Sequence, residues 1–255
     1  MPGDKNHLLG PDGEEALAST MRLRPLLAFD FDGTLAPIVP RPGAARISVA
    51  LARRLDMLSR LLPVAVITGR SVDDVAPRLG FRPQFVIGNH GAEDPAMTAS
   101  DAGAELESLR SHLRSRAEGL KAAGVEVEDK TYSIALHYRL ASDRPKALDT
   151  IRSVLSETRG NTKAFGGKCV VNIVPENAPD KADAVENLVR RCASAGAIFV
   201  GDDVNDEAVF IRSQPTWLTV RVGRDDRGSQ ARYFLDNITE VGMMLQRMLD
   251  LAAST

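Results

Sequence analysis

Residues 26–35 constrain the fold more than any other part of this chain, because an apolar run there ends abruptly on acidic residues. The run reads LLAFDFDGTL. Strand geometry places Asp30 and Asp32 on one side and the phenylalanine before each of them on the other. Gly33 lets the chain turn sharply after the strand and leaves backbone N–H groups available to an anion. The run therefore predicts a buried strand that ends in a site for a charged ligand.

The carboxylates of Asp30 and Asp32 would repel each other if both lay on one side of the strand. At a separation of about 4 Å and an effective dielectric constant of about 20, this repulsion is on the order of 4 kcal/mol. The pair must share a proton or hold a cation, and we expect a cation. The alternative is a buried strand that ends in an ordinary Asp-Gly turn, and the segments described below argue against it.

Composition and charge exclude several classes of function. The formal net charge is -2 at pH 7, whereas a protein that binds nucleic acid or an anionic membrane needs a basic stripe or patch. No stretch approaches the roughly 20 apolar residues of a membrane-spanning helix. The first residues lack the apolar core of a secretory signal. We therefore expect a cytoplasmic protein, monomeric or weakly dimeric, without nucleic-acid or membrane partners.

Two further strands are expected after the first one, with helical segments between them. Residues 48–62 carry apolar side chains at helical spacing, and residues 64–70 then read as a buried strand that includes Thr68. Residues 71–74 begin another helix, and residues 85–89 form the third strand. This alternation predicts the α/β class, with a doubly wound, Rossmann-like parallel sheet whose ligands bind at the carboxyl ends of the strands.

The pattern changes in the middle of the chain, where a smaller α+β unit with an open sheet is expected. Its predicted elements are a helix over residues 104–123, alternating segments over 125–128 and 131–139, a helix over 144–158 and a strand over 168–174.

The first pattern resumes with a helix that starts near Lys181 and a buried strand over residues 197–201. This late strand needs the sheet of the first half as its neighbour. The sequence therefore predicts a core domain split by an insertion. The core domain comprises residues 1–93 and 176–255, and the inserted α+β cap domain comprises residues 94–175.

Acidic side chains follow the predicted core strands at the edge where ligands bind. The segment GDDVND at residues 201–206 follows the late strand, as Asp30 and Asp32 follow the first one. Oxygen ligands without histidine or thiolate partners favour Mg²⁺. We therefore predict Mg²⁺ bound by Asp30, Asp32 and Asp202, with Asp32 contributing its main-chain carbonyl oxygen.

This set of residues predicts the hydrolysis of a phosphate monoester. Asp30 supplies the nucleophile and forms an aspartyl-phosphate, while Asp32 protonates the leaving alkoxide and later takes a proton from the attacking water. Thr68 and Lys181 hold the phosphate oxygens. Three further residues are expected to orient Lys181 and the waters on the metal: Asp203, Asn205 and Asp206.

The candidate substrate-binding residues of the core are Gly33, Gly69, Arg70, Asn89 and His90. His90 and His137 are also typical of hinge or packing positions, because neither has a second ligand at metal-binding spacing.

The four segments that carry these residues, taken in order, resemble the haloacid dehalogenase superfamily of phosphotransferases. The resemblance covers nearly the whole chain from about residue 24 and implies the same roles for Asp30 and Asp32 as nucleophile and acid/base. The large insertion follows Thr68 and precedes Lys181, which is similar to the C2-capped branch. Sugar-phosphate mutases generally carry a cap after the first motif, and dehalogenases lack the second aspartate, so the sequence disfavours both.

Finer segments are similar to the trehalose-6-phosphate phosphatases. They read GNHGAE at residues 88–93, EDKTYSIALHYR at 128–139, and GDD at 201–203 followed by DE at 206–207. In that family the cap contacts the disaccharide, which implies sugar-binding roles for Glu128, Arg139 and Lys168.

The sequence departs from that family at the GKxxxE motif, which here reads GKCVVN at residues 167–172. The closing glutamate is Asn172, so a neutral amide stands where a carboxylate is expected to bind sugar hydroxyls. The amide lacks charge assistance, which is worth about 1 kcal/mol per buried hydrogen bond. The family's threonine in the acidic loop is likewise Asn205. Trehalose 6-phosphate remains the leading substrate, and another glycosyl phosphate, such as glucosylglycerol phosphate or a pseudo-disaccharide phosphate, is the alternative.

The sequence thus predicts a Mg²⁺-dependent phosphatase whose partner is a small-molecule sugar phosphate and whose cap closes over that substrate. Two other classes of function remain open. One is a phosphotransferase that passes the phosphoryl group to another sugar. The other is a non-catalytic binding protein that has kept the scaffold, although the intact acidic residues argue against it.

Overall fold

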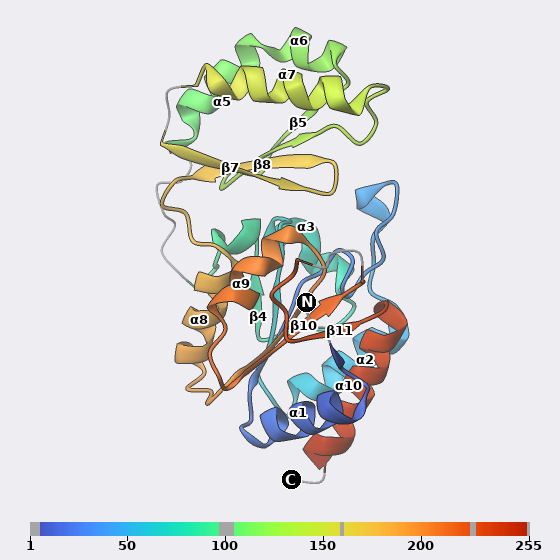
Figure 1. The fold of residues 1–255 in the computed structure, drawn as a ribbon. Coiled ribbons are helices and arrows are strands. Elements are labelled where there is room, and N and C mark those ends of the chain that lie inside the picture. Colours follow the sequence, from blue (N-terminus) through green and yellow to red (C-terminus); the bar gives the residue numbers. More distant parts are fainter. Residues whose placement is uncertain (1–5, 97–104, 159–160, 225–227, 254–255) are drawn as a thin grey trace. The chain divides into compact units, whose positions relative to one another are not determined.

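The computed structural model describes residues 6–96, 105–158, 161–224 and 228–253. The chain divides into two compact units, drawn in Figure 1. Met1–Gly91 and Pro179–Thr255 form the first, here called the core unit, and Ala92–Ala178 form the second, here called the inserted unit.

The core unit is built on a seven-stranded sheet whose neighbouring strands all pair in parallel. In spatial order its strands are β1 (Asn6–His7), β11 (Tyr233–Leu235), β10 (Trp217–Val222), β9 (Ala197–Gly201), β2 (Leu26–Phe29), β3 (Val64–Ile67) and β4 (Phe85–Ile87). From β2, the chain adds β3 and β4 on one side, and later adds β9 and β10 on the other. The point where a parallel sheet reverses its order in this way forms a crevice for ligands.

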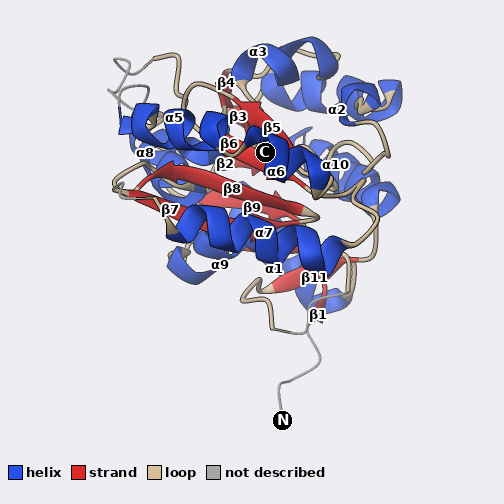
Figure 2. Cartoon of the chain, turned by 90° about the horizontal axis from the view of Figure 1, so that it is seen from above, coloured by secondary structure: helices blue, strands red, loops and turns tan. Residues whose placement is uncertain are grey.

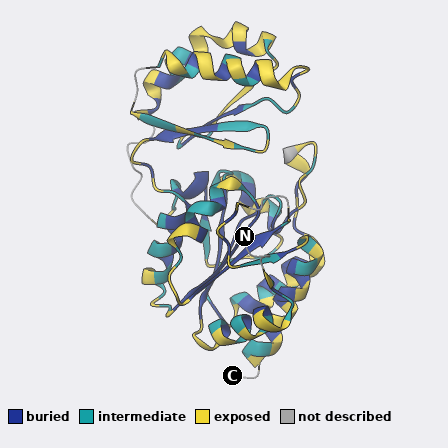
Figure 3. Cartoon of the chain, viewed as in Figure 1, coloured by how far each residue is buried: buried dark blue, intermediate teal, exposed yellow. Residues whose placement is uncertain are grey.

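Helices cover both faces of this sheet because successive strand residues point to opposite sides. Leu27 and Phe29 pack in one apolar cluster with α1 (Pro11–Arg22), α2 (Val49–Ser59) and α10 (Ile238–Ala253). Leu26 and Ala28 pack in the other with α8 (Lys181–Arg191) and α9 (Glu207–Arg212). The central strands are buried along their whole length, as Figure 3 shows. This doubly wound sheet confirms the predicted α/β class.

Short helical segments complete the core unit. They are η1 (Pro42–Ala44), α3 (Val72–Val75), η2 (Ala76–Arg78), η3 (Asn89–Gly91) and η4 (Val204–Asp206). Among the helices of the described residues, none is both long and apolar enough to cross a membrane.

The inserted unit contains a four-stranded antiparallel sheet with helices on one face. The strand order is β5 (Glu126–Asp129), β6 (Ile134–His137), β8 (Val170–Pro175) and β7 (Thr162–Gly167). Ile134 and Leu136 of β6 join an apolar cluster with α5 (Glu107–Ser115), α6 (Ala117–Ala122) and α7 (Arg144–Ser156). These three helices lie over one face of the sheet (Figures 1 and 2). The sequence predicted a small α+β insertion with an open sheet; the antiparallel pairing of its strands comes from the structure.

Two details of the inserted unit differ from the predicted elements. The single helix expected over residues 104–123 is broken at Arg116, where φ is -105° and ψ is 5°. The N–H of Arg116 is shared between the carbonyls of His112 and Leu113, as is common where a helix ends. Ala104, the expected start, lies outside the described residues. Strand β7 was not predicted, because its two glycines interrupt any alternating apolar pattern.

Candidate active site

The ends of β2, β9 and β3 bring three of the predicted site residues to one edge of the core sheet. The N–H of Asp30 donates to the carbonyl of Val200 at 2.9 Å, so Asp30 lies beside the end of β9. The N–H of Thr68 donates to the carbonyl of Ile87 at 2.9 Å. Asp202 follows β9 directly. These side chains therefore lie at the point where the strand order reverses, as the sequence predicted.

Gly33 allows a close approach between the turn after β2 and the acidic loop after β9. Its φ is +87°, and a Cβ atom there would lie 2.1 Å from Oδ2 of Asp202. The next residue, Thr34, donates from Oγ1 to Oδ1 of Asp202 at 3.2 Å. The N–H of Gly33 itself donates to the carbonyl of Ala36 at 2.7 Å. From the sequence this N–H is expected to be available to an anion, but in the structure the turn uses it.

Lys181, in the first turn of α8, contacts two of the aspartates at this edge of the sheet. The preceding Asp180 caps this helix through a reciprocal pair of hydrogen bonds with Asp183. From this fixed start, Nζ of Lys181 donates to Oδ1 of Asp30 at 2.8 Å and to Oδ1 of Asp206 at 2.7 Å. The ammonium group thus joins the ends of β2 and η4.

Asp206 binds Lys181 and also holds the acidic loop after β9 in place. Its Oδ2 accepts from the N–H groups of Asp202 and Asp203, both at 2.9 Å. Gly201 makes room for this carboxylate, since a Cβ there would lie 2.3 Å from Cγ of Asp206. Asn205 lies half-buried in η4, between the two carboxylates that cap this turn. The predicted orienting role of Asp206 toward Lys181 is thus matched by a direct contact.

The buried charges of this group do not balance. Lys181 and the carboxylates of Asp30, Asp202 and Asp206 are all at most 5% exposed. With all four groups ionised, they carry three negative charges against one positive charge. Burial raises the pKa of Asp30 well above its ordinary value; Lys181 opposes this shift, and Asp206 and Asp202 add to it. Burial alone would lower the pKa of Lys181, but the charges of Asp206 and Asp30 outweigh it and raise that pKa.

This surplus of two negative charges fits a divalent cation. One carboxylate oxygen from each of Asp30, Asp202 and Asp206 lies within 4.8 Å of the others. The donors are all hard oxygens, as Mg²⁺ prefers. The residues present at this edge therefore suit Mg²⁺ in both charge and donor type.

The side chain of Asp32 lies apart from this acidic group. Its Oδ2 accepts from Nε of Arg70 at 2.6 Å and its Oδ1 accepts from Nη2 at 2.7 Å. We expected strand alternation to bring Asp32 beside Asp30, but β2 ends at Phe29, so the alternation does not extend to these aspartates. The two carboxylates are instead neutralised by different cations, Lys181 and Arg70. Arg70 was predicted to bind substrate, and in the structure it binds Asp32.

The loop after β3 is held by the residues that follow β4. The carbonyl of Thr68 accepts from the N–H of His90 at 2.9 Å, and the carbonyl of Arg70 accepts from the N–H of Asn89 at 2.8 Å. Asn89 and His90 have left-handed backbones, with φ of 49° and 61°. The imidazole of His90 lies so close that a Cβ at Gly69 would be 2.3 Å from Cε1. Four predicted substrate-binding residues thus build the loop that presents Thr68.

In the inserted unit, strand pairing brings two of the predicted sugar-binding residues into one row. Ala135 of β6 lies opposite Glu128 of β5 on one side and opposite Asn172 of β8 on the other. Phe165 of β7 continues the row beyond Asn172. Directly paired residues of antiparallel strands share a face. This face is opposite to the one that α5, α6 and α7 cover, since Ile134 and Leu136 point toward those helices.

Glu128 is held by neighbours on the same sheet. Its Oε2 lies 2.7 Å from Nε2 of His137 and 3.5 Å from Nζ of Lys130. The hydrogen bond with His137 lowers the pKa of Glu128, against the effect of burial, and the charge of Lys130 adds to the lowering. His137 therefore contacts a predicted sugar-binding residue, a contact that the sequence analysis did not foresee.

Arg139 and Lys168 meet at the turn between β7 and β8. Nη2 of Arg139 donates to the carbonyl of Lys168 at 2.9 Å. Lys168 is exposed, and the next residue, Cys169, has a φ of +64° in the tight turn. The two residues therefore lie together at one end of the sheet, whereas Asn172 lies in the row of Glu128.

Several residues that hold the core site in place were not predicted from the sequence. Thr34 binds Asp202, and Arg212 binds both capping residues of α8. Asp74 and Arg78 extend the ion pair of Arg70, as described below. Asp74 is four residues after Arg70, and Arg78 is four residues after Asp74. This spacing was the available signal, because residues four apart face one another on a helix.

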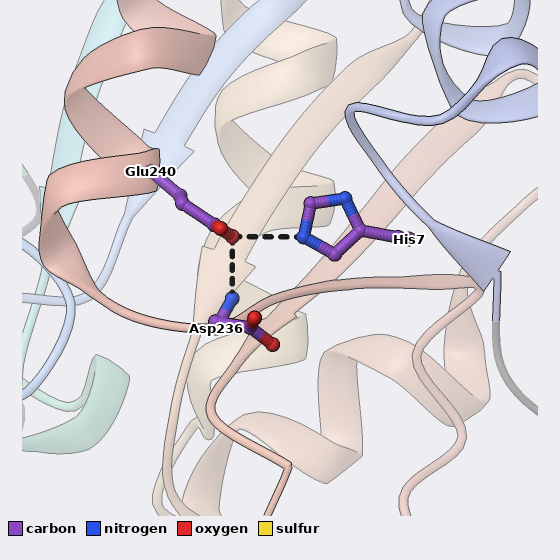
Figure 4. Close-up of side chains that lie close together, drawn as sticks. All are labelled: His7, Asp236 and Glu240. Carbon is purple, nitrogen blue, oxygen red and sulfur yellow. Dashed lines mark hydrogen bonds and ion pairs between the residues drawn. The ribbon is translucent and has the colours of Figure 1, made fainter.

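A second group of metal-binding residue types lies far from the acidic edge, at His7, Asp236 and Glu240 (Figure 4). The N–H of Leu9 donates to Nδ1 of His7 at 3.2 Å, so Nε2 carries the proton that faces Glu240 at 2.9 Å. Glu240 also accepts from the backbone N–H of Asp236. These bonds fasten β1 to the start of α10, and the protonated Nε2 argues against a metal ligand.

Comparison with known sequences gives one family over most of the chain. A family model described as trehalose-phosphatase matches residues 28–239. The trehalose-phosphate phosphatase of Mycobacterium marinum (strain ATCC BAA-535 / M) is 30% identical over 246 residues, covering 90% of this chain and 62% of that protein. An uncharacterized glycosyl hydrolase of Mycobacterium tuberculosis (strain CDC 1551 / Oshkosh) is 31% identical over 242 residues, covering 86% of this chain and 18% of that protein. The chain thus spans less than two thirds of the length of these relatives.

Comparison with solved structures shows the same fold. The C-terminal domain of a trehalose-6-phosphate phosphatase from C. albicans matches with a TM-score of 0.77 and 22% identity, covering 98% of both chains. A sucrose-phosphatase from Synechocystis sp. PCC6803 matches with a TM-score of 0.56 and 18% identity, covering 88% of this chain and 98% of that one.

Proposed function

The chain belongs to the trehalose-phosphatase family, and from this premise we propose that it is a Mg²⁺-dependent phosphomonoesterase that converts trehalose 6-phosphate to trehalose and phosphate. A free sugar phosphate is a charged metabolite of the cell interior, so we place the reaction in the cytoplasm. We expect the chain to act as a monomer or a weak homodimer.

One observation carries the proposal: a buried group of three carboxylates and one ammonium with a surplus of two negative charges. Bringing several carboxylates together in a buried site is costly, so a fold keeps such a group where it binds a cation for function. Asp30 and Asp202 would hold Mg²⁺, together with the main-chain carbonyl of Asp32. Bound there, Mg²⁺ supplies neutralisation of the charge on the transferred phosphoryl group.

Asp30 is the proposed nucleophile. One of its carboxylate oxygens attacks phosphorus, the bond from phosphorus to the sugar oxygen breaks, and an aspartyl-phosphate forms. Lys181 holds Asp30 in place and, with Thr68, stabilises the charge on the phosphate oxygens. Asp206 fixes Lys181, and Asp203 and Asn205 complete the turn that carries Asp202.

Asp32 is the proposed general acid and base. It gives a proton to the departing sugar oxygen and then takes one from the water that hydrolyses the aspartyl-phosphate. The proton and the electron pair of each step are thus accounted for by the two aspartates, the ester and one water. Gly33, Gly69, Asn89 and His90 shape the surrounding loops, and Arg70 binds Asp32.

The inserted unit would bind the sugar. We assign this role to the row that contains Glu128 and Asn172, and to Arg139 and Lys168 at the end of the sheet. Asn172 is 3% exposed and neutral, where the family has a glutamate. This observation favours a second candidate, a phosphatase for another glycosyl phosphate such as glucosylglycerol phosphate or a pseudo-disaccharide phosphate.

The test is a panel of sugar phosphates incubated with the protein and MgCl₂, with release of inorganic phosphate as the measurement. We expect release from trehalose 6-phosphate, and none after EDTA is added. Release from a different glycosyl phosphate alone would support the second candidate. New phosphate esters without free phosphate would identify a phosphotransferase, and no reaction with any ester would contradict both phosphatase proposals.

A further inference from the structure

Four side chains of alternating charge contact one another in sequence: Asp32, Arg70, Asp74 and Arg78. Arg70 gives two nitrogens to Asp32, and its third nitrogen, Nη1, donates to Oδ2 of Asp74 at 2.6 Å. The other oxygen of Asp74 accepts from Nη2 of Arg78. Arg78 in turn donates from Nη1 to the carbonyl of Gly43, in η1. A single guanidinium is therefore shared between two carboxylates, those of Asp32 and Asp74.

The shared guanidinium is fixed in place. The side chain of Arg70 is 11% exposed, and its central carbon lies 5.2 Å from the centre of the Phe31 ring. Phe31 is fully buried. Nε of Arg78 also donates to the carbonyl of Asp74 at 2.7 Å, which fixes that residue from a second side. Asp74 and Phe31 thus hold Arg70 independently of Asp32.

Asp32 is more exposed than Arg70, its partner. Its side chain is 39% exposed, yet both of its carboxylate oxygens accept charge-assisted hydrogen bonds from Arg70. A proton on either oxygen would face an N–H donor of Arg70, so Asp32 can act as an acid toward a substrate only after it leaves Arg70. Bidentate bonds of this type are strong, so the release of Asp32 is a step of its own.

We propose that Asp74 is a positioning residue: by sharing the guanidinium of Arg70, it permits the carboxylate of Asp32 to turn from Arg70 to the leaving oxygen of the substrate. When Asp32 turns away, Arg70 keeps an anionic partner and stays over Phe31. Once released, Asp32, which is open to solvent, takes up a proton from water and passes it to the sugar oxygen, as the bond from Asp30 to phosphorus forms and the ester bond breaks. The inference rests on the proposed function, which makes Asp32 the acid and base.

The leaving group offers a way to test this role. A sugar alkoxide needs a proton to depart, whereas p-nitrophenolate departs without one. The ratio kcat/KM reports steps up to the first irreversible one, here the formation of the aspartyl-phosphate with loss of the leaving group. A defect in the release of Asp32 should therefore reduce kcat/KM for trehalose 6-phosphate and spare p-nitrophenyl phosphate. Damage to the nucleophile or the metal site would reduce both.

The variant is Asp74→Asn, which keeps the size of the side chain and removes its charge. The matched control is Asp73→Asn, since Asp73 lies on the same short helix, carries the same charge and is exposed. We expect Asp74→Asn to lower kcat/KM for trehalose 6-phosphate by roughly tenfold or more and that for p-nitrophenyl phosphate by less than about threefold. Asp73→Asn should leave both unchanged, and Asp74→Glu should restore part of the loss.

Two results, each with an active wild type, would overturn this inference and leave the proposed function standing. In one, Asp74→Asn lowers kcat/KM equally for both esters; in the other, it lowers kcat/KM for neither. Thermal unfolding of each variant separates the first result from general instability, because Asp74→Asn retains the N–H that Ser71 caps. A wild type that releases phosphate from neither ester in MgCl₂ would instead overturn the proposed function, and the role of Asp74 with it.

Discussion

The acidic edge of the core sheet and the polar face of the inserted sheet hold charged side chains in opposite ways. At the edge, Asp30, Asp206 and Lys181 are buried and joined by hydrogen bonds of 2.7 to 2.8 Å. On the inserted sheet, Glu128 has a side chain that is 49% exposed, and its partner His137 is 33% exposed. The first arrangement fixes each charge from several sides. The second leaves its charges in contact with solvent.

This difference follows from the cost of burying charge. A buried ion that loses its partner destabilises a fold by several kcal/mol, so each residue of the edge depends on the others. An exposed ion pair contributes at most about 1 kcal/mol, so its members can change with little effect on the fold. The proposed phosphoryl chemistry therefore depends on residues that also stabilise the fold, whereas the exposed charges of the surface proposed to choose the sugar can change with little effect on the fold. On the same sheet Asn172, which is 3% exposed, stands where the family has a glutamate, so this buried position holds no charge.

The largest expected effect comes from removing the proposed nucleophile, Asp30. We expect Asp30→Asn to lower kcat by at least about 10³-fold for every phosphate ester, because no other group replaces a nucleophile. The measurement is phosphate release in MgCl₂. Turnover near that of the wild type would contradict the assigned role.

The same variant should fold normally. The pKa of Asp30 is raised by burial, opposed by Lys181 and raised further by Asp206 and Asp202, so its charge is disfavoured in the folded state without a metal. Asparagine removes that charge, and we expect a melting temperature in EDTA equal to or above that of the wild type. A much lower melting temperature would show that Asp30 serves stability rather than chemistry.

A second prediction compares lysines of the two units. Lys181→Met leaves two buried carboxylates without their cation, which should lower the free energy of unfolding by about 3 to 5 kcal/mol. Lys121→Met, on the exposed side of α6 in the inserted unit, should change it by no more than about 0.5 kcal/mol. Urea denaturation of both variants is the measurement. Similar losses in the two would remove the distinction drawn above between buried and exposed charge.

A third prediction concerns the surplus negative charge. Mg²⁺ at a free concentration of 100 times its dissociation constant should stabilise the wild type by about 2.7 kcal/mol, read as a rise in melting temperature. Asp202→Asn should abolish most of this rise, because it removes one of the proposed ligands. Glu128→Gln, a loss of one charge on the inserted sheet, should keep it. An equal rise in all three proteins would place the ion elsewhere.

The position of the core site could be predicted from the sequence because it depends on where strands end. Apolar runs that stop at Asp30, Thr68 and Asp202 place these residues at one edge of any parallel sheet. The direction of the Asp32 side chain could not be predicted in the same way. It follows from the turn at Gly33 and from Arg70, which is 38 residues away in the sequence, and no local pattern encodes that pairing.

The inserted unit was predictable in class and less so in detail. Alternating apolar residues predicted β5 and β6, and the segment over residues 168–174 predicted β8. The row of Glu128 and Asn172, however, depends on the register between β6 and β8, which are not consecutive. A shift of one residue would send Asn172 to the opposite face. The contact between Glu128 and His137 depends on register too, which is why a histidine predicted as a packing residue is found beside a carboxylate.

The smallest expected effect lies on the inserted sheet, at Asn172. Asn172→Glu restores the residue of the family motif, and Asn172→Gln is its neutral control of the same size. If trehalose 6-phosphate is the native substrate, the Glu variant should match or exceed the wild type in kcat/KM for it, by up to roughly tenfold, since a charge-assisted hydrogen bond is stronger than a neutral one. The Gln variant should show no such gain, which separates the effect of charge from that of size.

A collapse of kcat/KM in the Glu variant alone, with the wild type preferring another glycosyl phosphate, would instead assign that ester as the substrate. In both cases the rate with p-nitrophenyl phosphate should stay within about threefold of the wild type, because this ester lacks the sugar that Asn172 is proposed to bind.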